Sequence, residues 1–336
     1  MITAYIRSSS LGTLKMCETQ YYISYVLGID QKTNQRAELG TIFHKVMECL
    51  ALCRLREQKN EDYVIKDDAI GDIPTDFDFQ SDGGIAILID RAYEYYTKRS
   101  THEYKKAHYK EVCQWVPDTL NYKNGIYDPR KRDIFAAEQK FDIEIPYDWA
   151  KYSYELRGEK IEGNLHIKGT IDLILDVNPS TVEVCDWKTG ASRKDWATGK
   201  QKEYADFQKD TQLMLYYYAI KKLYPDKNVI FTIFWVRDGG PFTLCFDESD
   251  MLAVEQNLKE KSAYIWKNTQ PSMLSKTQND FRCYRLCHYC KHDWPGTSIN
   301  ICNYVQQHIK KNGIQNTTEE LMAKGFNPGI YRSPGE

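Results

Sequence analysis

Two carboxylates and a lysine stand on neighbouring apolar runs near the middle of the chain. Asp172 lies in the run 171–177, Asp186 lies in the run 182–187, and Lys188 follows directly. The Asn-Pro-Ser segment between the runs is typical of a turn. Two strands joined by this turn would bring the three side chains together. Two carboxylates beside a lysine are suited to the hydrolysis of a phosphodiester.

The chemistry of that reaction explains the residue types. Cleavage at neutral pH needs an activated water and positive charge near the phosphate, and a divalent cation can supply both. Mg²⁺ is usually held by one or two carboxylates and by substrate phosphate oxygens, which Asp172 and Asp186 would complement. Residues two apart on a strand face the same side, so we expect Lys188 to lie beside Asp186 and Trp187 to face the core. Lys188 would orient the attacking water or offset charge on the phosphorus.

Composition limits the class of protein. The 336 residues suit one large domain or two smaller ones. The 45 Lys and Arg residues nearly balance the 47 Asp and Glu residues, so any basic surface for nucleic acid must be local. The sequence shows neither a long apolar span nor the apolar core of a signal peptide, which predicts a cytoplasmic protein without a membrane segment. Ten cysteines in a reducing compartment indicate metal or cluster ligation wherever they gather.

Helices are predicted on the N-terminal side of the acidic motif. A helix over 5–28 contains Cys17, which on this segment alone is typical of a buried structural cysteine. A second helix, over 37–56, carries His44 on an apolar face. Such a histidine is usually a core residue, although neutral imidazole is also a competent ligand for Mn²⁺.

The segment 57–133 predicts a helical insertion or lid. Its polar part, 57–84, favours a loop, and 85–98 favours a helix. The part 104–132 mixes Lys, Tyr and Trp, which fits either a solvated helix face or a surface along a DNA path.

Strand patterns begin near Ile134, and Gly158 to Gly163 is predicted as a turn between strands. Glu138, on the strand preceding the acidic motif, is a candidate further carboxylate. After the motif, Gln212 and Tyr216 lie four residues apart and so share a helical face. Further elements complete an α/β core, a mixed central sheet flanked by helices: a helix over 206–223, strands over 229–237 and 241–246, and a helix over 250–267.

Four cysteines crowd into a short C-terminal segment: Cys283, Cys287, Cys290 and Cys302. Close spacing lets thiolates converge on one ion, and four thiolates can close a zinc site or hold an iron–sulfur cluster. The tail 311–336, with its scattered Gly and Pro residues, is predicted to be irregular.

The order of these motifs resembles the RecB-like PD-(D/E)XK nucleases that carry an iron–sulfur cluster, a group similar to CRISPR-associated adaptation nucleases and phage exonucleases. The residues that carry the resemblance are Cys17, the G-x-x-x-H motif ending at His44, Asp172, the D-x-K motif of Asp186 and Lys188, the Q-x-x-x-Y motif of Gln212 and Tyr216, and the cysteine cluster. The resemblance implies a restriction-endonuclease-like core whose N- and C-terminal ends are joined by a [4Fe–4S] cluster.

The resemblance also implies roles for residues. Mg²⁺ or Mn²⁺ would be bound by His44, Asp172, Asp186 and the backbone carbonyl of Trp187. Lys188, Gln212 and Tyr216 would complete the catalytic set, with the glutamine positioning phosphate or lysine and the tyrosine contacting nucleic acid.

The cluster ligands implied by the resemblance are Cys17, Cys287, Cys290 and Cys302. The family's usual C-x2-C-x5-C pattern becomes C-x2-C-x11-C here. An insertion around 295–300 would explain the spacing, and otherwise Cys283 is the fourth ligand. A zinc ion held by the four C-terminal cysteines is the alternative cofactor.

We therefore predict a metal-dependent deoxyribonuclease, an exonuclease acting on DNA ends or single strands in recombination, repair or phage DNA processing. The alternatives are a non-catalytic DNA-binding scaffold, against which the intact acidic motif argues, and a nuclease that acts on RNA. The sequence lacks a Walker A motif, so a motor would come from a helicase or recombination partner. Ring-forming relatives imply that an oligomer is an option.

The expected divisions of the chain are N-terminal helices over 1–56, an insertion over 57–133, a nuclease core over 134–270, a cysteine-rich segment over 271–310 and a tail over 311–336.

Overall fold

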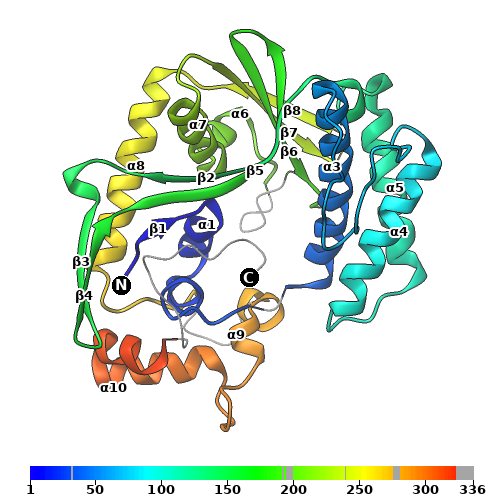
Figure 1. Ribbon diagram of the computed structural model, residues 1–336. Helices are drawn as coiled ribbons and strands as arrows, with labels where there is room; N and C mark the ends of the chain where they lie inside the picture. Colours follow the sequence, from blue (N-terminus) through cyan, green and yellow to red (C-terminus); the bar gives the residue numbers. More distant parts are fainter. Residues whose placement is uncertain (32, 191–192, 194–199, 239, 275–280, 323–336) are drawn as a thin grey trace. The chain divides into compact units, whose positions relative to one another are not determined.

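The computed structural model describes residues 1–31, 33–190, 193, 200–238, 240–274 and 281–322 (Figure 1). The chain divides into two compact units, and each is assembled from segments that lie far apart in the sequence. The first unit comprises Met1–Lys32, Phe141–Gly169 and Glu248–Glu336, and the second comprises Thr33–Lys140 and Thr170–Asp247.

The second unit contains a mixed sheet. Strand β5 (His166–Asn178), which enters this unit at Thr170, pairs antiparallel with β6 (Thr181–Lys188). Strand β6 pairs parallel with β7 (Asn228–Trp235), and β7 pairs antiparallel with β8 (Gly240–Cys245). Strand β2 (Ile134–Glu144) pairs with β5. The predicted α/β core with a mixed sheet is therefore confirmed.

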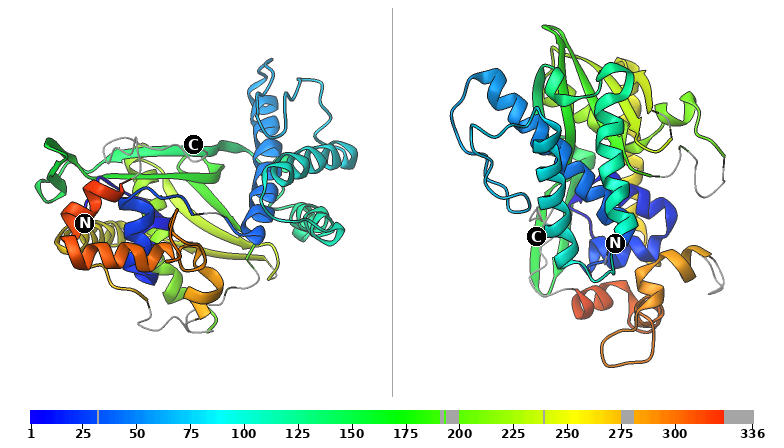
Figure 2. Two further views of the ribbon diagram at one scale, coloured as in Figure 1. Left: turned by 90° about the horizontal axis from the view of Figure 1, so that it is seen from below. Right: turned by 90° about the vertical axis from the view of Figure 1, so that its right-hand side faces the viewer.

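Three long helices of the second unit lie side by side, as the right-hand view of Figure 2 shows. They are α3 (Gln35–Lys59), α4 (Asp82–Arg99) and α5 (Lys106–Asn121). Apolar residues of all three join one core that also includes Trp187 of β6. Because Trp187 is 2% exposed and points to this core, its neighbours on β6 must face the other side. The core thus fixes the orientation of the acidic strand.

The remaining elements of the second unit are short, apart from one helix that packs on β7. That helix is α7 (Thr211–Leu223), and α6 (Tyr204–Gln208) precedes it. The sequence predicts a single helix over 206–223, but the chain breaks at Asp210, whose carboxylate accepts a hydrogen bond from the backbone N–H of Gln212. An N-cap at this position starts a new helix. Short 3-10 turns cover Tyr122–Asn124 and Pro129–Lys131.

The first unit is built from short strands and helices. Strand β1 (Tyr5–Ile6) pairs parallel with the beginning of β5, and β3 (Lys151–Leu156) forms a hairpin with β4 (Glu159–Asn164). The helices and helical turns are α1 (Ser8–Met16), α2 (Glu18–Tyr21), η1 (Tyr22–Val26), η4 (Asp148–Ala150), α8 (Glu248–Lys267), η5 (Arg282–Leu286), α9 (His288–Lys291) and α10 (Ile301–Leu321).

Two local predictions in the first unit need correction. The helix predicted over 5–28 is interrupted at Cys17, whose extended backbone (φ −159°, ψ 115°) separates α1 from α2. The turn predicted over 158–163 is shorter, because Arg157 and Gly158 both take positive φ and β4 begins at the next residue. A two-residue connection of this kind closes a tight hairpin.

The tail predicted as irregular over 311–336 is wrong for its first part. Helix α10 continues to Leu321 through a kink at Gly313, where φ is 76°. Thr318 is buried and its hydroxyl lies 2.8 Å from that of Tyr22, so the end of the helix is fixed to η1. Residues 323–336 lie outside the described part. None of the described helices is long and apolar enough to cross a membrane.

Candidate active site

The two aspartates of the motif lie on adjacent strands in the second unit. Leu173 pairs with Cys185 in this antiparallel pair of strands. Asp172 directly precedes Leu173 and Asp186 directly follows Cys185, so the two aspartates lie next to that pair on the same side of it. The backbone N–H of Trp187 donates a hydrogen bond of 3.2 Å to Asp172 Oδ2. Asp186 is only 2% exposed. The pairing of β5 with β6 thus brings together two carboxylates that are separated by a turn in the sequence.

Lys188 and Gln212 form a hydrogen-bonded network around Asp186. The Lys188 ammonium lies 2.6 Å from Asp186 Oδ2 and donates a hydrogen bond of 2.8 Å to Gln212 Oε1. The Gln212 amide donates to Asp186 Oδ1 at 3.1 Å and to the Tyr216 hydroxyl at 2.8 Å. Tyr216 in turn donates to the carbonyl of Thr170 on β5. One face of α7 therefore holds the D-x-K motif in place.

His44 reaches the site from α3. Its Nδ1 lies 3.3 Å from Asp172 Oδ2, and its ring makes an edge contact with that of Trp187 at a centroid distance of 6.3 Å. The G-x-x-x-H spacing places Gly40 one helical turn before the histidine, where α3 approaches the end of β6. A Cβ at Gly40 would lie 2.6 Å from Thr189 Oγ1. The glycine therefore permits the close approach that brings His44 to the carboxylates.

A third carboxylate, Glu138 of β2, lines the same pocket. Its backbone has φ of 46°, which is uncommon for a residue other than glycine. Burial, followed by repulsion from Asp172 and Glu48, raises the pKa of Glu138 to about 8. The candidate that the sequence offers as a further carboxylate thus lies with the predicted site residues.

The two motif aspartates have opposite pKa shifts. Burial alone would raise the pKa of Asp172, but the charge of His44 and its hydrogen bond, together with the charge of Lys188, outweigh burial and lower it. Burial dominates at Asp186, whose pKa rises to about 6 despite the attraction of Lys188, and repulsion from Asp172 adds to this rise. Burial would lower the pKa of His44 and of Lys188, yet the neighbouring carboxylates raise both. The negative charge of the carboxylates at the site therefore exceeds the positive charge that His44 and Lys188 supply.

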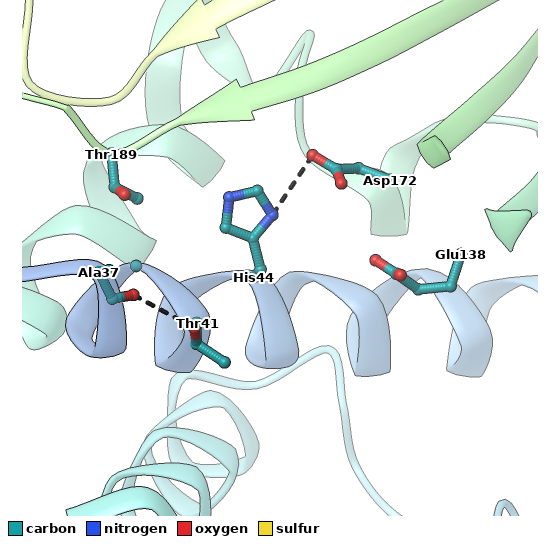
Figure 3. Close-up of a pocket in the computed structure, with 7 residues that line it drawn as sticks. Ala37, Thr41, His44, Glu138, Asp172 and Thr189 are labelled. Carbon is teal, nitrogen blue, oxygen red and sulfur yellow. Dashed lines mark hydrogen bonds and ion pairs between the residues drawn. The ribbon is translucent and has the colours of Figure 1, made fainter. Parts of the chain in front are cut away.

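His44, Asp172 and Glu138 open onto a pocket of about 340 Å³, drawn in Figure 3. Its walls are formed by α3, by Glu138 and Asp172, and by the residue that follows Lys188: the lining residues are Ala37, Gly40, Thr41, His44, Glu138, Asp172 and Thr189. Figure 3 shows Thr189 on the far side of the His44 ring from Glu138. The carboxylates and the imidazole thus share one cavity with two threonines.

Comparison with known proteins decides the family. The family model of the PD-(D/E)XK nuclease superfamily matches residues 8–294. The chain belongs to this superfamily. One solved structure, of a protein named "Putative exonuclease" from Eubacterium rectale, is 11% identical, covers 90% of this chain and 92% of that chain, and has a TM-score of 0.48. No curated protein sequence matches.

PD-(D/E)XK nucleases typically use divalent metal ions, and the donor set of this member fits such an ion. Asp186 Oδ2 is buried and has the Lys188 ammonium close by, but it has no hydrogen bond of good geometry with any described residue. Asp172, Glu138 and His44 supply further oxygen and nitrogen donors where they line the neighbouring pocket. In the described arrangement, however, no three His, Cys, Asp or Glu side chains already meet the geometry of a metal site. An ion would therefore draw the carboxylates closer together.

The cysteines of the first unit lie close to one another. The Cys290 thiol interacts with the thiols of Cys287 and Cys302. The interaction with Cys287 lowers the pKa of Cys290, but the interaction with Cys302 and burial outweigh it and raise that pKa. The Cys17 thiol is near enough to Cys287 for the two charges to interact, although burial is the main reason that its pKa is raised. Cys283 is a charge neighbour of Cys290. Five thiols from the two ends of the sequence thus belong to one unit and are linked by pairwise interactions, although no three of the described thiols already have the geometry of a metal site.

The eleven residues between Cys290 and Cys302 fold back on themselves. Asp293 bridges Asn300, and the N–H of Ile301 donates to the carbonyl of His292 at 2.9 Å. The ring of Trp294 stacks on that of Tyr304 with a centroid distance of 4.5 Å. A small closed loop therefore accounts for the extra residues and returns the chain so that Cys302 reaches Cys290.

Sequence reasoning missed three residues around the nuclease pocket. Thr189 follows the D-x-K motif directly, and Thr41 lies three residues before His44 on the same helix face; position alone could have identified both. Lys45 is harder to predict. It forms ion pairs with Glu48 at 2.5 Å and with Asp67 at 2.9 Å, and Asp67 belongs to a loop whose path the sequence does not indicate.

Proposed function

We propose that this PD-(D/E)XK superfamily protein is a metal-dependent deoxyribonuclease that removes nucleotides from DNA ends or single strands. The observation that carries the proposal is the buried Asp186, with half-buried Asp172 on the adjacent strand and Lys188 at 2.6 Å from Asp186. A carboxylate buried beside another carboxylate costs stability, and burial raises the pKa of Asp186. A bound cation would offset that cost. Aspartates with a purely structural role would not need a cation.

The residues of the site divide the work of hydrolysis. Asp172, Asp186 and His44 would hold Mg²⁺ or Mn²⁺, with the carbonyl of Trp187 as a further ligand. When bound, the ion supplies an activated water and positive charge beside the phosphate. Lys188 is held by Gln212 and directs its ammonium toward the same place, where it orients the water and stabilises negative charge on the phosphate. Tyr216 holds Gln212 in turn.

The test is cleavage of labelled DNA, single-stranded or blunt-ended, with Mg²⁺ or Mn²⁺. Wild-type protein should shorten the DNA from its ends, and EDTA should stop the reaction. Asp186→Asn and Lys188→Met should each lower kcat by about 10²- to 10³-fold, the range seen when a single electrostatic group of a catalytic site is lost. Full activity in either variant would refute the site. Tight DNA binding without cleavage by the wild type would favour the scaffold alternative, and preference for RNA would favour the ribonuclease alternative.

We also propose that the first unit holds a [4Fe–4S] cluster through Cys17, Cys287, Cys290 and Cys302. The support is the interaction of Cys290 with Cys287 and Cys302, the charge interaction of Cys17 with Cys287, and the closed loop that returns Cys302 to Cys290. Four thiolates are the usual ligands of such a cluster. Anaerobic purification followed by an absorption spectrum and iron, sulfide and zinc analysis tests this. About four irons per chain are expected, whereas one zinc and no colour would favour the alternative zinc site.

A further inference from the structure

The mouth of the nuclease pocket contains two threonines whose hydroxyl groups are in different situations. Thr41 donates its hydroxyl hydrogen to the carbonyl of Ala37 at 3.2 Å, one turn earlier on α3. The hydroxyl of Thr189 has no hydrogen-bond partner among the residues that the structure describes, and the residue is half-buried in the pocket wall. The Thr189 hydroxyl is therefore the one that can donate to a ligand.

The position of Thr189 is set by the strand that carries the catalytic lysine. Strand β6 ends at Lys188, and the backbone carbonyl of Lys188 accepts a hydrogen bond from the N–H of Val236 at 3.0 Å. Thr189 follows immediately, so its backbone starts from a fixed point. Figure 3 shows its side chain on the same pocket as His44 and Asp172. A phosphate placed against the carboxylate site would have this hydroxyl beside it.

Gly40 limits the rotation of Thr189. A Cβ at Gly40 would come within 2.6 Å of Thr189 Oγ1 and within 3.7 Å of its Cβ. Oγ1 thus occupies the space that the missing side chain leaves. A methyl group at position 40 would force χ1 of Thr189 into another rotamer and move the hydroxyl. Gly40 and Thr189 therefore act as a pair.

We propose that Thr189 is a substrate-binding residue that donates a hydrogen bond to a non-bridging oxygen of the scissile phosphate, in a position maintained by Gly40. This assignment rests on the proposed nuclease function and deepens it. The wall that carries Glu138 and Asp172 repels phosphate unless a cation is bound there. The Thr189 hydroxyl on the opposite wall is neutral, so its hydrogen bond to phosphate does not depend on the ion. The substrate class is any nucleic-acid strand that presents one phosphate to this pocket.

The first experiment measures kcat and KM of variants on a labelled single-stranded oligonucleotide. Thr189→Val keeps the shape and removes the donor, and it should lower kcat/KM by about tenfold or more, as expected for a lost hydrogen bond to a charged group. Thr189→Ser should recover most of the activity. Thr97→Val is the matched control and should stay within about threefold of wild type, because the Thr97 hydroxyl is engaged by the carbonyl of Tyr93 one turn earlier on α4 and Thr97 does not line the pocket.

A second variant separates positioning from folding. Gly40→Ala raises helix propensity within α3, so the melting temperature should not fall far, while kcat/KM should fall as it does in Thr189→Val. The double variant Gly40→Ala with Thr189→Val should be no worse than the more impaired single variant, because both changes remove the same contact. Additive losses would overturn the pairing of Gly40 with Thr189.

A sulfur-substituted substrate provides a readout that a structural role would not change. Each phosphorothioate diastereomer places sulfur, a weak hydrogen-bond acceptor, at one non-bridging position of the scissile phosphate. Thr189→Val should lose about tenfold on the all-oxygen substrate but less than about threefold on one diastereomer. Equal losses on all three substrates, or no loss on any, would overturn the assignment of Thr189 alone. Absence of cleavage by the wild type with either metal ion would overturn the proposed function itself, and the Thr189 assignment with it.

Discussion

At the scale of single residues, the site depends on side chains that never touch its pocket. Lys45, next to His44 in the sequence, pairs with Glu48 and with Asp67. Asp67 also accepts hydrogen bonds from the backbone N–H groups of Ala69 and Ile70, each at 2.8 Å. Burial would raise the pKa of Asp67, but the hydrogen bond from Lys45 and those backbone bonds together lower it. This aspartate thus fastens a loop to the helix that carries the histidine.

The lowered pKa of Asp67 predicts a pH-dependent stability. A carboxyl whose pKa is lower in the folded state than in the unfolded state stabilises above the unfolded value and loses that effect as the pH falls through the folded value. Asp67→Asn should therefore reduce the free energy of unfolding by about 1–3 kcal/mol at pH 7. The difference in this free energy between wild type and variant should narrow below about pH 4. Urea unfolding of both proteins across this pH range measures the difference. Asp68→Asn, at an exposed neighbour, is the control, and a gap that is constant with pH would contradict the role given to Asp67.

Residue-scale prediction from the sequence succeeds where strand alternation decides. Asp186 and Lys188 had to face one side because Trp187 faces the core, and the structure places them 2.6 Å apart. Glu138 could only be a candidate, since its place at the pocket depends on a positive φ that nothing in its neighbours signals. The position of Thr189 directly after the D-x-K motif could have marked it as a site residue, but its unengaged hydroxyl is visible only in three dimensions.

At the scale of elements, helix periodicity located α3, α4 and α7, but the ends of the helices depend on caps. Ser81 accepts a hydrogen bond from the N–H of Gly84 at 3.0 Å and so starts α4 three residues before the predicted helix begins. Gly84 is needed there for a second reason. A Cβ on it would lie 1.8 Å from the carbonyl oxygen of Asp78, a backbone atom that cannot rotate away.

The two adjacent glycines of α4 give a matched prediction. Gly84→Ala should destabilise the protein by about 1–3 kcal/mol or more, because the loop before α4 must move. Gly83→Ala meets nothing closer than the Ser81 hydroxyl at 3.7 Å, so it should be neutral or stabilising by up to about 1 kcal/mol through helix propensity. Thermal unfolding of the two variants compares them directly. Equal melting temperatures would show that the loop adapts without cost.

At the scale of the whole molecule, the sequence order of the motifs conceals how the units are assembled. The first unit takes its residues from both ends of the chain and from the middle, and the second takes the segments in between. Cys17 and Cys302 therefore belong to one unit, while the nuclease motifs that separate them in the sequence belong to the other. The resemblance implies that a cluster joins the two ends, which stays a prediction, whereas spacing alone would have favoured a local site of the four C-terminal cysteines.

The proposed cluster makes a prediction that tests this assembly. Cys17→Ser and Cys302→Ser should each lose iron and lower the melting temperature, because ligand binding at such a site is coupled to folding. The two changes should have similar effects although they lie at opposite ends of the chain. Cys283→Ser should keep about four irons, since the resemblance implies Cys302 as the fourth ligand and the Cys302 side chain interacts with that of Cys290. Cys245→Ser, at an exposed cysteine of β8 in the other unit, is the control. If Cys17→Ser retained full iron while Cys283→Ser lost its metal, the site would be local to the C-terminal segment and the ends of the chain would be joined by packing alone.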